Sequence, residues 1–285
     1  ITEDGTPSHK DRYFDSDGVR LLYKIRTGML FLQSTTARIA VGECSANLNQ
    51  VVNFIINQQM TRLQNHGWLI CHAAAVERSG QAVALAGISG GGKSTLMLHL
   101  MSDPRWNFLT NDRLFIKRGG STIMAMGVAK LPRINPGTLL NNPKLRSILP
   151  QQRIDELATM PREELWRLEE KYDVDVLTLY GDNRTRHHAD LSAFIILNWS
   201  HSSEQPTTIS RVDLQQQPDL LNTIMKSAGP LYQKSDGSFL HGHAPPSPAA
   251  YHSMLAGVAI YSAEGGVEFD LLRSFCDTME LPSSG

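Results

Sequence analysis

The residues with the clearest chemical potential form an eight-residue run at positions 87–94, which reads G-I-S-G-G-G-K-S. The run matches G-x-x-x-x-G-K-[ST], the P-loop, in which backbone N–H groups surround the phosphates of a nucleotide. Glycines suit this task because they adopt positive φ and place no Cβ between the backbone and a phosphate oxygen. The residues predicted to contact the nucleotide are Gly87, Ile88, Ser89, Gly90, Gly91, Gly92, Lys93, Ser94 and Thr95.

Two side chains of this run add charge and metal chemistry. Lys93 can reach the terminal phosphates as a point charge, and the Ser94 hydroxyl can ligate Mg²⁺. The helix that follows contributes unpaired N–H groups and the positive end of its dipole. The motif therefore predicts a site for a nucleotide polyphosphate and Mg²⁺.

The flanking residues agree with the motif. Residues 81–86 form a short apolar run typical of a buried strand, and residues 94–101 carry leucines and methionines at helical spacing. A shorter pattern, G-x-S-x-G at 87–91, overlaps the run and is the nucleophile elbow of α/β-hydrolases. We favour the P-loop because it explains more of the residues, including the Gly-Lys-Ser end.

Composition places the chain among ordinary globular proteins. It has 285 residues, of which 41% are apolar and 19% charged, with a formal net charge of -1. This balance provides no whole-chain attraction to nucleic acid or to an anionic membrane, and no apolar run has the length of a membrane span. Three widely separated cysteines argue against a disulfide framework or a cysteine-based zinc site. With a polar start and no visible signal peptide, we expect a cytoplasmic protein.

The distribution of apolar residues predicts two parts. Residues 18–43 alternate as two or three strands of a meander, and residues 47–66 have the spacing of an amphipathic helix. We expect 1–66 to form an N-terminal meander plus helix, packed on or continuous with a core that spans 67–285.

Within that core the sequence predicts several further strands. Strands before, around and long after the P-loop indicate a mixed sheet flanked by helices. The charged region 130–180 is expected to form a helical excursion. The predicted strands are 68–76, 81–86, 108–110, 114–116, 191–199, and a late hairpin of 258–261 with 267–269.

The order of several of these residues resembles a known family. His72 lies in the run C-H-A-A-A-V, Lys93 follows in the P-loop, and Asn111 and Asp112 come after the next apolar run. This order is similar to that of the HPr kinase/phosphorylase family, and is closest to the HPr-kinase-related bacterial proteins. The resemblance is sharp over residues 68–117 and does not cover the N-terminal strands.

The resemblance implies a P-loop fold like that of phosphoenolpyruvate carboxykinase and ATP-dependent phosphorylation of a hydroxyl, a protein serine in the parent family. It implies that His72 lies beside the transferred phosphoryl group. The family's catalytic base corresponds to Asn111, which cannot accept a proton. Either Asp112 replaces it as base, or Asp112 only holds Mg²⁺ and Asn111 orients the acceptor. The family's metal-binding glutamate has its nearest match in Glu170, although the family's glycines are missing there.

Several cations could assist. Lys130, Arg133 and Lys171 could bind phosphate or the acceptor, and Arg184 or Arg186 could supply an arginine to the γ-phosphate. Solvated loop cations are the alternative interpretation of all five.

Together these features predict an ATP- and Mg²⁺-dependent kinase that acts on a hydroxyl of a protein, with a serine favoured by the resemblance. Two alternatives remain: a non-catalytic nucleotide-binding regulator, and a small-molecule kinase of the same fold. The preference for ATP over GTP rests on the resemblance alone. The sequence leaves a homo-oligomer open, since the parent family assembles into rings.

Overall fold

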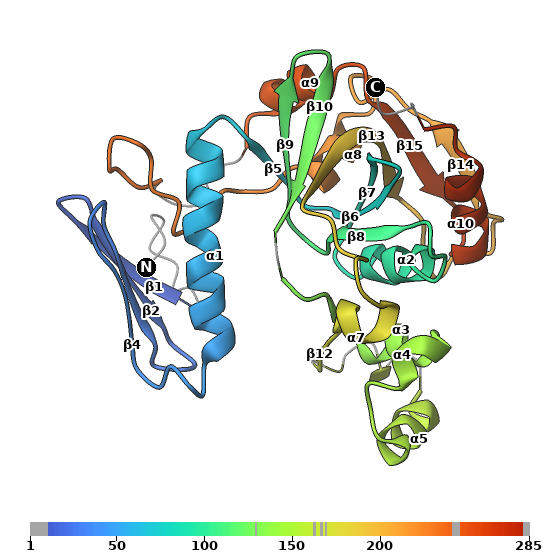
Figure 1. Cartoon of the computed structure of the whole chain (residues 1–285), viewed down its shortest axis with the longest axis horizontal. Helices are drawn as coiled ribbons and strands as arrows, with labels where there is room; N and C mark the ends of the chain where they lie inside the picture. Colours follow the sequence, from blue (N-terminus) through green and yellow to red (C-terminus); the bar gives the residue numbers. More distant parts are fainter. Residues whose placement is uncertain are drawn as a thin grey trace. The chain divides into compact units, whose positions relative to one another are not determined.

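The computed structural model describes residues 11–128, 130–161, 164–165, 168, 170–240 and 246–281 (Figure 1). The chain divides into two compact units. The first comprises the described parts of Ile1–Ile70 and Lys226–Ser247, and the second those of Cys71–Met225 and Pro248–Gly285. None of the helices in the described ranges has both the length and the apolar character needed to cross a membrane.

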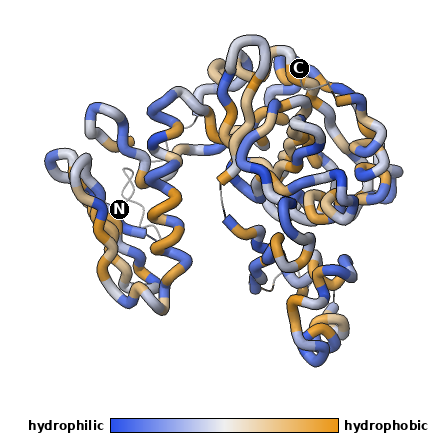
Figure 2. Tube along the Cα trace, in the orientation of Figure 1, coloured by the Kyte–Doolittle hydropathy of each residue, from blue (hydrophilic) through white to orange (hydrophobic). Residues whose placement is uncertain are grey.

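The first unit is an antiparallel sheet with one long helix. Its four strands pair in chain order: β1 (Asp11–Ser16), β2 (Val19–Lys24), β3 (Leu30–Gln33) and β4 (Arg38–Val41). Helix α1 (Leu48–Asn65) lies along this sheet, and its Phe54 packs on Phe31 with 4.9 Å between ring centroids. Hydrophobic residues recur among hydrophilic ones along α1 and the strands, as Figure 2 shows. Residues 18–43 thus hold three strands, as expected, and β1 adds a fourth strand before them.

A distant segment completes the first unit. The Gln33 amide donates to the Leu231 carbonyl at 2.9 Å, and the buried Arg20 guanidinium donates to the carbonyls of Pro230 and Leu240. These contacts join positions about 200 residues apart, so no local sequence pattern indicates them. The predicted division into an N-terminal part, 1–66, packed on or continuous with a core of 67–285, stays a prediction.

The second unit is built on a mixed sheet. Its strands follow the path β9-β10-β13-β7-β6-β8, and β15 also pairs with β13 and with β14. The β7–β13 and β13–β15 pairs are parallel, and the other pairs along this path are antiparallel. The strands are β6 (Ala74–Arg78), β7 (Gln81–Gly87), β8 (Asn107–Thr110), β9 (Leu114–Gly119), β10 (Thr122–Gly127), β13 (His188–Leu197), β14 (Thr208–Arg211) and β15 (Ala259–Glu264).

Helices and a small two-stranded sheet accompany this mixed sheet. Helix α2 follows β7 directly and buries Leu96, Met97, Leu98 and Leu100 in the core. The helices are α2 (Lys93–Leu100), α3 (Pro136–Leu140), α4 (Pro143–Arg146), α5 (Gln151–Thr159), α7 (Val176–Tyr180), α8 (Pro218–Ile224), α9 (Pro248–Leu255) and α10 (Phe269–Thr278). The predicted excursion contains α3 to α7 together with β11 (Arg133–Ile134), which pairs with β12 (Tyr172–Asp173).

Two predicted strands are wrong. The expected strand 68–76 is interrupted, because β5 (Leu69–Cys71) ends before a bend at His72 and β6 begins at Ala74. The His72 N–H donates to the Ile224 carbonyl at 2.8 Å instead of to a sheet neighbour. The late hairpin is also wrong.

Of the late hairpin, only β15 forms. Residue Phe269 begins α10, an amphipathic helix that buries Leu272 and Cys276. Leu272 and Cys276 are spaced for one face of a helix, and this spacing agrees with the structure better than the short apolar run at 267–269 does.

Candidate functional site

The glycine-rich loop, residues 87–94, connects β7 to α2 in the order that the motif requires. Gly87 ends β7 with φ +145°, and a Cβ there would lie 2.9 Å from the Leu197 carbonyl oxygen. Gly92 caps α2 in the left-handed region, and a Cβ there would lie 3.0 Å from the Phe269 ring. A side chain at either position would therefore displace the loop from the strand and helix that support it.

Two aromatic residues hold this loop from behind. The buried Trp199 indole N–H donates to the Gly91 carbonyl at 2.9 Å. The Phe269 ring meets the Trp199 ring edge-on, with 5.2 Å between centroids. Sequence reasoning missed both roles: it placed each residue at the end of a predicted strand, and no local signal links either residue to the loop.

Lys93 is the first residue of α2 and its side chain folds back across the loop. Its ammonium group donates to the Gly87 carbonyl at 2.8 Å and to the Ile88 carbonyl at 3.0 Å, and the residue is only 8% exposed. The side chain is thus held at the mouth of the loop, next to the first backbone N–H groups of α2. A lysine in this position can exchange carbonyl contacts for contacts with a phosphate.

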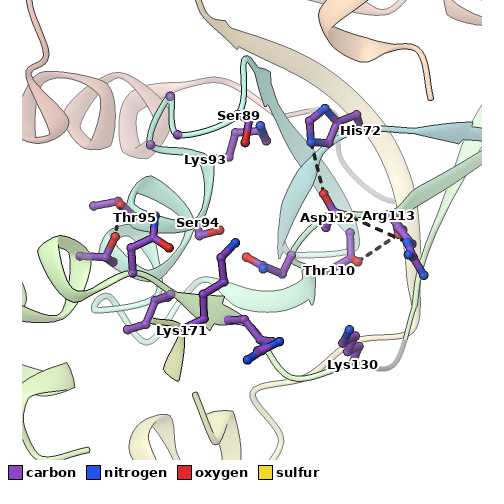
Figure 3. A pocket seen from close by; sticks show the side chains of 18 of the residues that line it. His72, Ser89, Lys93, Ser94, Thr95, Thr110, Asp112, Arg113, Lys130 and Lys171 are labelled. Atoms are coloured by element: carbon purple, nitrogen blue, oxygen red, sulfur yellow. Dashed lines mark hydrogen bonds and ion pairs between the residues drawn. The ribbon is translucent and has the colours of Figure 1, made fainter. Parts of the chain in front are cut away.

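Three further predicted residues converge near the loop. His72 Nε2 lies 3.3 Å from Asp112 Oδ1, and Asp112 also lies 3.7 Å from the Arg113 guanidinium (Figure 3). Asn111 and Asp112 belong to the turn between β8 and β9, whereas His72 belongs to the bend before β6. The amide oxygen of Asn111 is buried and has no hydrogen-bond partner within the described ranges.

Lys93, His72, Asn111 and Asp112 line one cavity of about 380 Å³. The cavity combines the loop, the His72–Asp112 pair and several cations from the excursion. Its lining residues are His72, Ser89, Gly90, Gly91, Gly92, Lys93, Ser94, Thr95, Thr110, Asn111, Asp112, Arg113, Val128, Lys130, Leu131, Arg133, Ile134, Asn135, Thr138 and Lys171.

Three predicted site residues lie elsewhere. Gly87 and Ile88 are outside the lining, since Gly87 belongs to β7 and the Ile88 side chain is 65% exposed. Glu170 is also outside: it accepts a hydrogen bond from Arg153 at 2.7 Å and another from the Tyr172 hydroxyl. The hydrogen bond from Tyr172, which has the larger effect, and the one from Arg153 lower the pKa of Glu170. Its predicted role as a metal ligand finds no support in these contacts and stays a prediction.

The two remaining predicted cations, Arg184 and Arg186, lie outside the lining of the cavity. The Arg184 guanidinium donates to the carbonyls of Met101, Asp103 and Trp106, which lie in the segment between α2 and β8. These bonds give Arg184 a structural role. Arg186 pairs with Glu77 at 3.5 Å. Neither lines the cavity, so a role for either at the γ-phosphate stays a prediction.

The lining residues fit a nucleotide with Mg²⁺. The N–H groups that begin α2 and the Lys93 ammonium suit phosphates. The Ser94 hydroxyl and the Asp112 carboxylate are hard oxygen ligands of the kind that Mg²⁺ prefers. The unpartnered Asn111 oxygen can accept a hydrogen bond from a bound hydroxyl or water. Among the described residues, no group of three or more His, Cys, Asp or Glu side chains forms a self-contained metal site, so phosphates and water would complete the coordination.

Comparisons with family models and with curated proteins gave no match. Among solved structures, the chain is similar to the Hpr(Ser) kinase/phosphatase from Coxiella burnetii, with a TM-score of 0.37 and 12% sequence identity. The match covers 73% of this chain and 93% of that chain. A similarity of this size carries no argument about function.

Proposed function

We propose that this protein is an ATP- and Mg²⁺-dependent kinase that transfers a γ-phosphoryl group to a hydroxyl. One observation carries the proposal: a single cavity is lined by the glycine-rich loop, its lysine and serine, and the His72–Asp112 pair. These residues come from three separate segments, and a phosphate-handling site would use all of them.

The nucleotide is held by the loop end of the cavity. The backbone N–H groups of the loop and of the first turn of α2, together with the Lys93 ammonium, bind its phosphates, and the Ser94 hydroxyl ligates Mg²⁺. When bound, ATP with Mg²⁺ supplies the phosphoryl group and part of the neutralising charge. The choice of ATP rests on the resemblance described above.

The transfer forms a bond between the acceptor oxygen and the γ-phosphorus and breaks the bond between that phosphorus and the oxygen of the β-phosphate. The proton of the acceptor hydroxyl moves to the Asp112 carboxylate, and His72, 3.3 Å from it, orients that carboxylate. Asn111 cannot accept the proton, but its buried amide oxygen can accept the hydroxyl's hydrogen bond while the acceptor is positioned. A loose transition state needs positioning and charge neutralisation more than a strong base.

Lys93→Ala tests the nucleotide site. We expect the change to lower ATP turnover at least about a hundredfold, because it removes the cation nearest the developing charge. The measurement is ADP release by purified protein, with melting temperature as the test of folding. Lys234→Ala is the matched control, since Lys234 is an exposed lysine of the first unit. Wild-type turnover in Lys93→Ala would refute the site.

A second candidate function is a nucleotide-binding regulator without transfer activity. Asn111 favours it, because an amide stands where the similar family has its catalytic base. This candidate predicts that ATP raises the melting temperature while no ADP is released, whereas the kinase predicts both effects. Labelled ATP incubated with a cell lysate, before and after removal of protein, then separates a protein serine from a small-molecule acceptor.

A further inference from the structure

The side of the cavity away from the glycine-rich loop is strongly cationic. Four side chains form it, here called the cationic wall: Arg113, Lys130, Arg133 and Lys171. Figure 3 shows Lys130 and Lys171 across the cavity from Ser89. Among the described lining residues, the only carboxylate is that of Asp112.

The wall is assembled by the fold and is not one charged helix face. Arg113 follows the turn after β8, Lys130 and Arg133 lie between β10 and β11 or within β11, and Lys171 precedes β12. The β11–β12 pairing brings the last two segments together, with Arg133 opposite Asp173 in register. Solvated loop cations would have no reason to converge from three segments on one cavity.

The four cations of the wall lie beside two carboxylates, those of Asp112 and Asp173. Arg133 is paired with Asp173 at 3.1 Å, and Arg113 lies 3.7 Å from Asp112. Burial, followed by the nearby guanidinium groups of Arg113 and Arg133, lowers the pKa of Lys130. Like charges gathered in a partly buried cavity destabilise one another, and an anion bound among them relieves that repulsion.

The nucleotide does not account for this charge. Its phosphates belong at the loop, where Lys93 and the N–H groups that begin α2 receive them. The cationic wall faces the space from which the acceptor hydroxyl must approach Asp112. The charge there is therefore matched to the acceptor.

We propose that the acceptor is a small hydroxy compound that carries a phosphate or carboxylate group, which the cationic wall binds. The inference rests on the proposed function and names its substrate class. The cavity of about 380 Å³ lies within the range of small-ligand sites. The acceptor's anionic group binds Lys130 and Lys171, and this contact places its hydroxyl near Asp112 and Asn111.

A binding experiment tests the wall separately from the loop. Purified full-length protein is first saturated with Mg²⁺ and a non-hydrolysable ATP analogue, and is then titrated by calorimetry with glycerol 3-phosphate, glycerate or glycerol. We expect at least one anionic probe to bind about tenfold or more tightly than glycerol. The two anionic arms distinguish a phosphate from a carboxylate as the preferred group.

Matched variants locate the binding. Lys171→Gln and Lys130→Gln should each weaken the preferred anion about fivefold or more, whereas Lys144→Gln, at an exposed lysine of α4 outside the cavity, should not. Lys171 is exposed, so its replacement should leave folding intact, as a melting curve will show.

Three outcomes overturn the inference: neither anion binds better than glycerol, both lysine variants bind the anion normally, or only an acidic serine peptide binds through these lysines. Failure of the ATP analogue to bind counts instead against the proposed function. In that case the Lys93→Ala variant, titrated with the anionic probes, still tests the cationic wall. We expect this variant to bind the preferred anion.

Discussion

The two units of this chain are assembled in opposite ways. In the first, β1 to β4 each pair with their neighbour in sequence, as in β1 with β2 from Asp11↔Lys24 to Ser16↔Val19. In the second, the central strand β13 pairs with β7, β10 and β15, which lie far from it along the chain. Only the second arrangement brings His72, the loop and Asp112 to one cavity.

The two units also use charge differently. In the first, the buried Arg20 pairs with Asp15 at 2.6 Å and lies against the rings of Tyr13 and Phe239. In the second, cations gather around a cavity whose lining contributes little opposing charge. The comparison teaches that enclosed charge is neutralised within the first unit, whereas in the second the proposed binding site holds several cations together, at some cost in stability.

The largest expected effect tests the long-range assembly. In Gly127→Ala the new Cβ would lie 1.9 Å from the Leu109 carbonyl oxygen, where β10 passes β8. We expect the free energy of unfolding to fall by about 3 kcal/mol. Gly119→Ala is the control, because a Cβ there meets nothing within 4 Å. Equal denaturation midpoints in urea for the two variants would show that this crossing is not tightly packed.

Arg20→Met tests the charge of the first unit. The change removes the ion pair between Arg20 and Asp15 and the donor to Pro230 and Leu240, so we expect a loss of about 2 kcal/mol. Arg38→Met, at an exposed arginine of β4, should change stability by less than about 0.5 kcal/mol. Chemical denaturation followed by circular dichroism measures both. A tenfold fall in ATP turnover in folded Arg20→Met would contradict the division of roles between the units.

Trp199→Phe tests the support of the glycine-rich loop. Loss of the bond to the Gly91 carbonyl should cost about 1 kcal/mol and weaken nucleotide binding about fivefold. Trp106→Phe removes a similar indole bond, to Asp277 at 2.7 Å, at a residue outside the cavity. It should lower stability without changing nucleotide affinity. Calorimetric titration distinguishes the two, and an equal loss of affinity in both would count against a local role for Trp199.

The smallest effect concerns Lys130, whose pKa is lowered by burial and then by Arg113 and Arg133. A lowered lysine pKa means that the folded state disfavours the charged form. Lys130→Met should therefore raise the melting temperature at neutral pH, and the gain should vanish as pH rises through the lowered pKa toward the ordinary lysine pKa of 10.5. Lys117→Met, in β9 outside the cavity, is the control. A lower melting temperature in Lys130→Met would contradict the repulsion.

The sequence predicted the parts of the site that depend on near neighbours. The strand before the glycine-rich loop and the helix after it follow from short apolar runs, and β7 and α2 confirm both. The bend at His72 could not be predicted, because it depends on the Ile224 carbonyl, which lies about 150 residues away. The contacts of Glu170 could not be predicted either, because a motif does not show that Arg153 and Tyr172 each bind one oxygen of its carboxylate.

By itself, the sequence determined which groups can bind phosphate, since an eight-residue run contains the glycines, lysine and serine that this chemistry needs. The tertiary structure alone decided what faces them. Trp199 supports the loop because β13 pairs with β7, and His72 meets Asp112 because β6 pairs with β8. The β11–β12 pair brings the segments of Arg133 and Lys171 together in the cationic wall. Backbone conformation is governed by neighbours in the chain, whereas the surroundings of a charge are governed by neighbours in space.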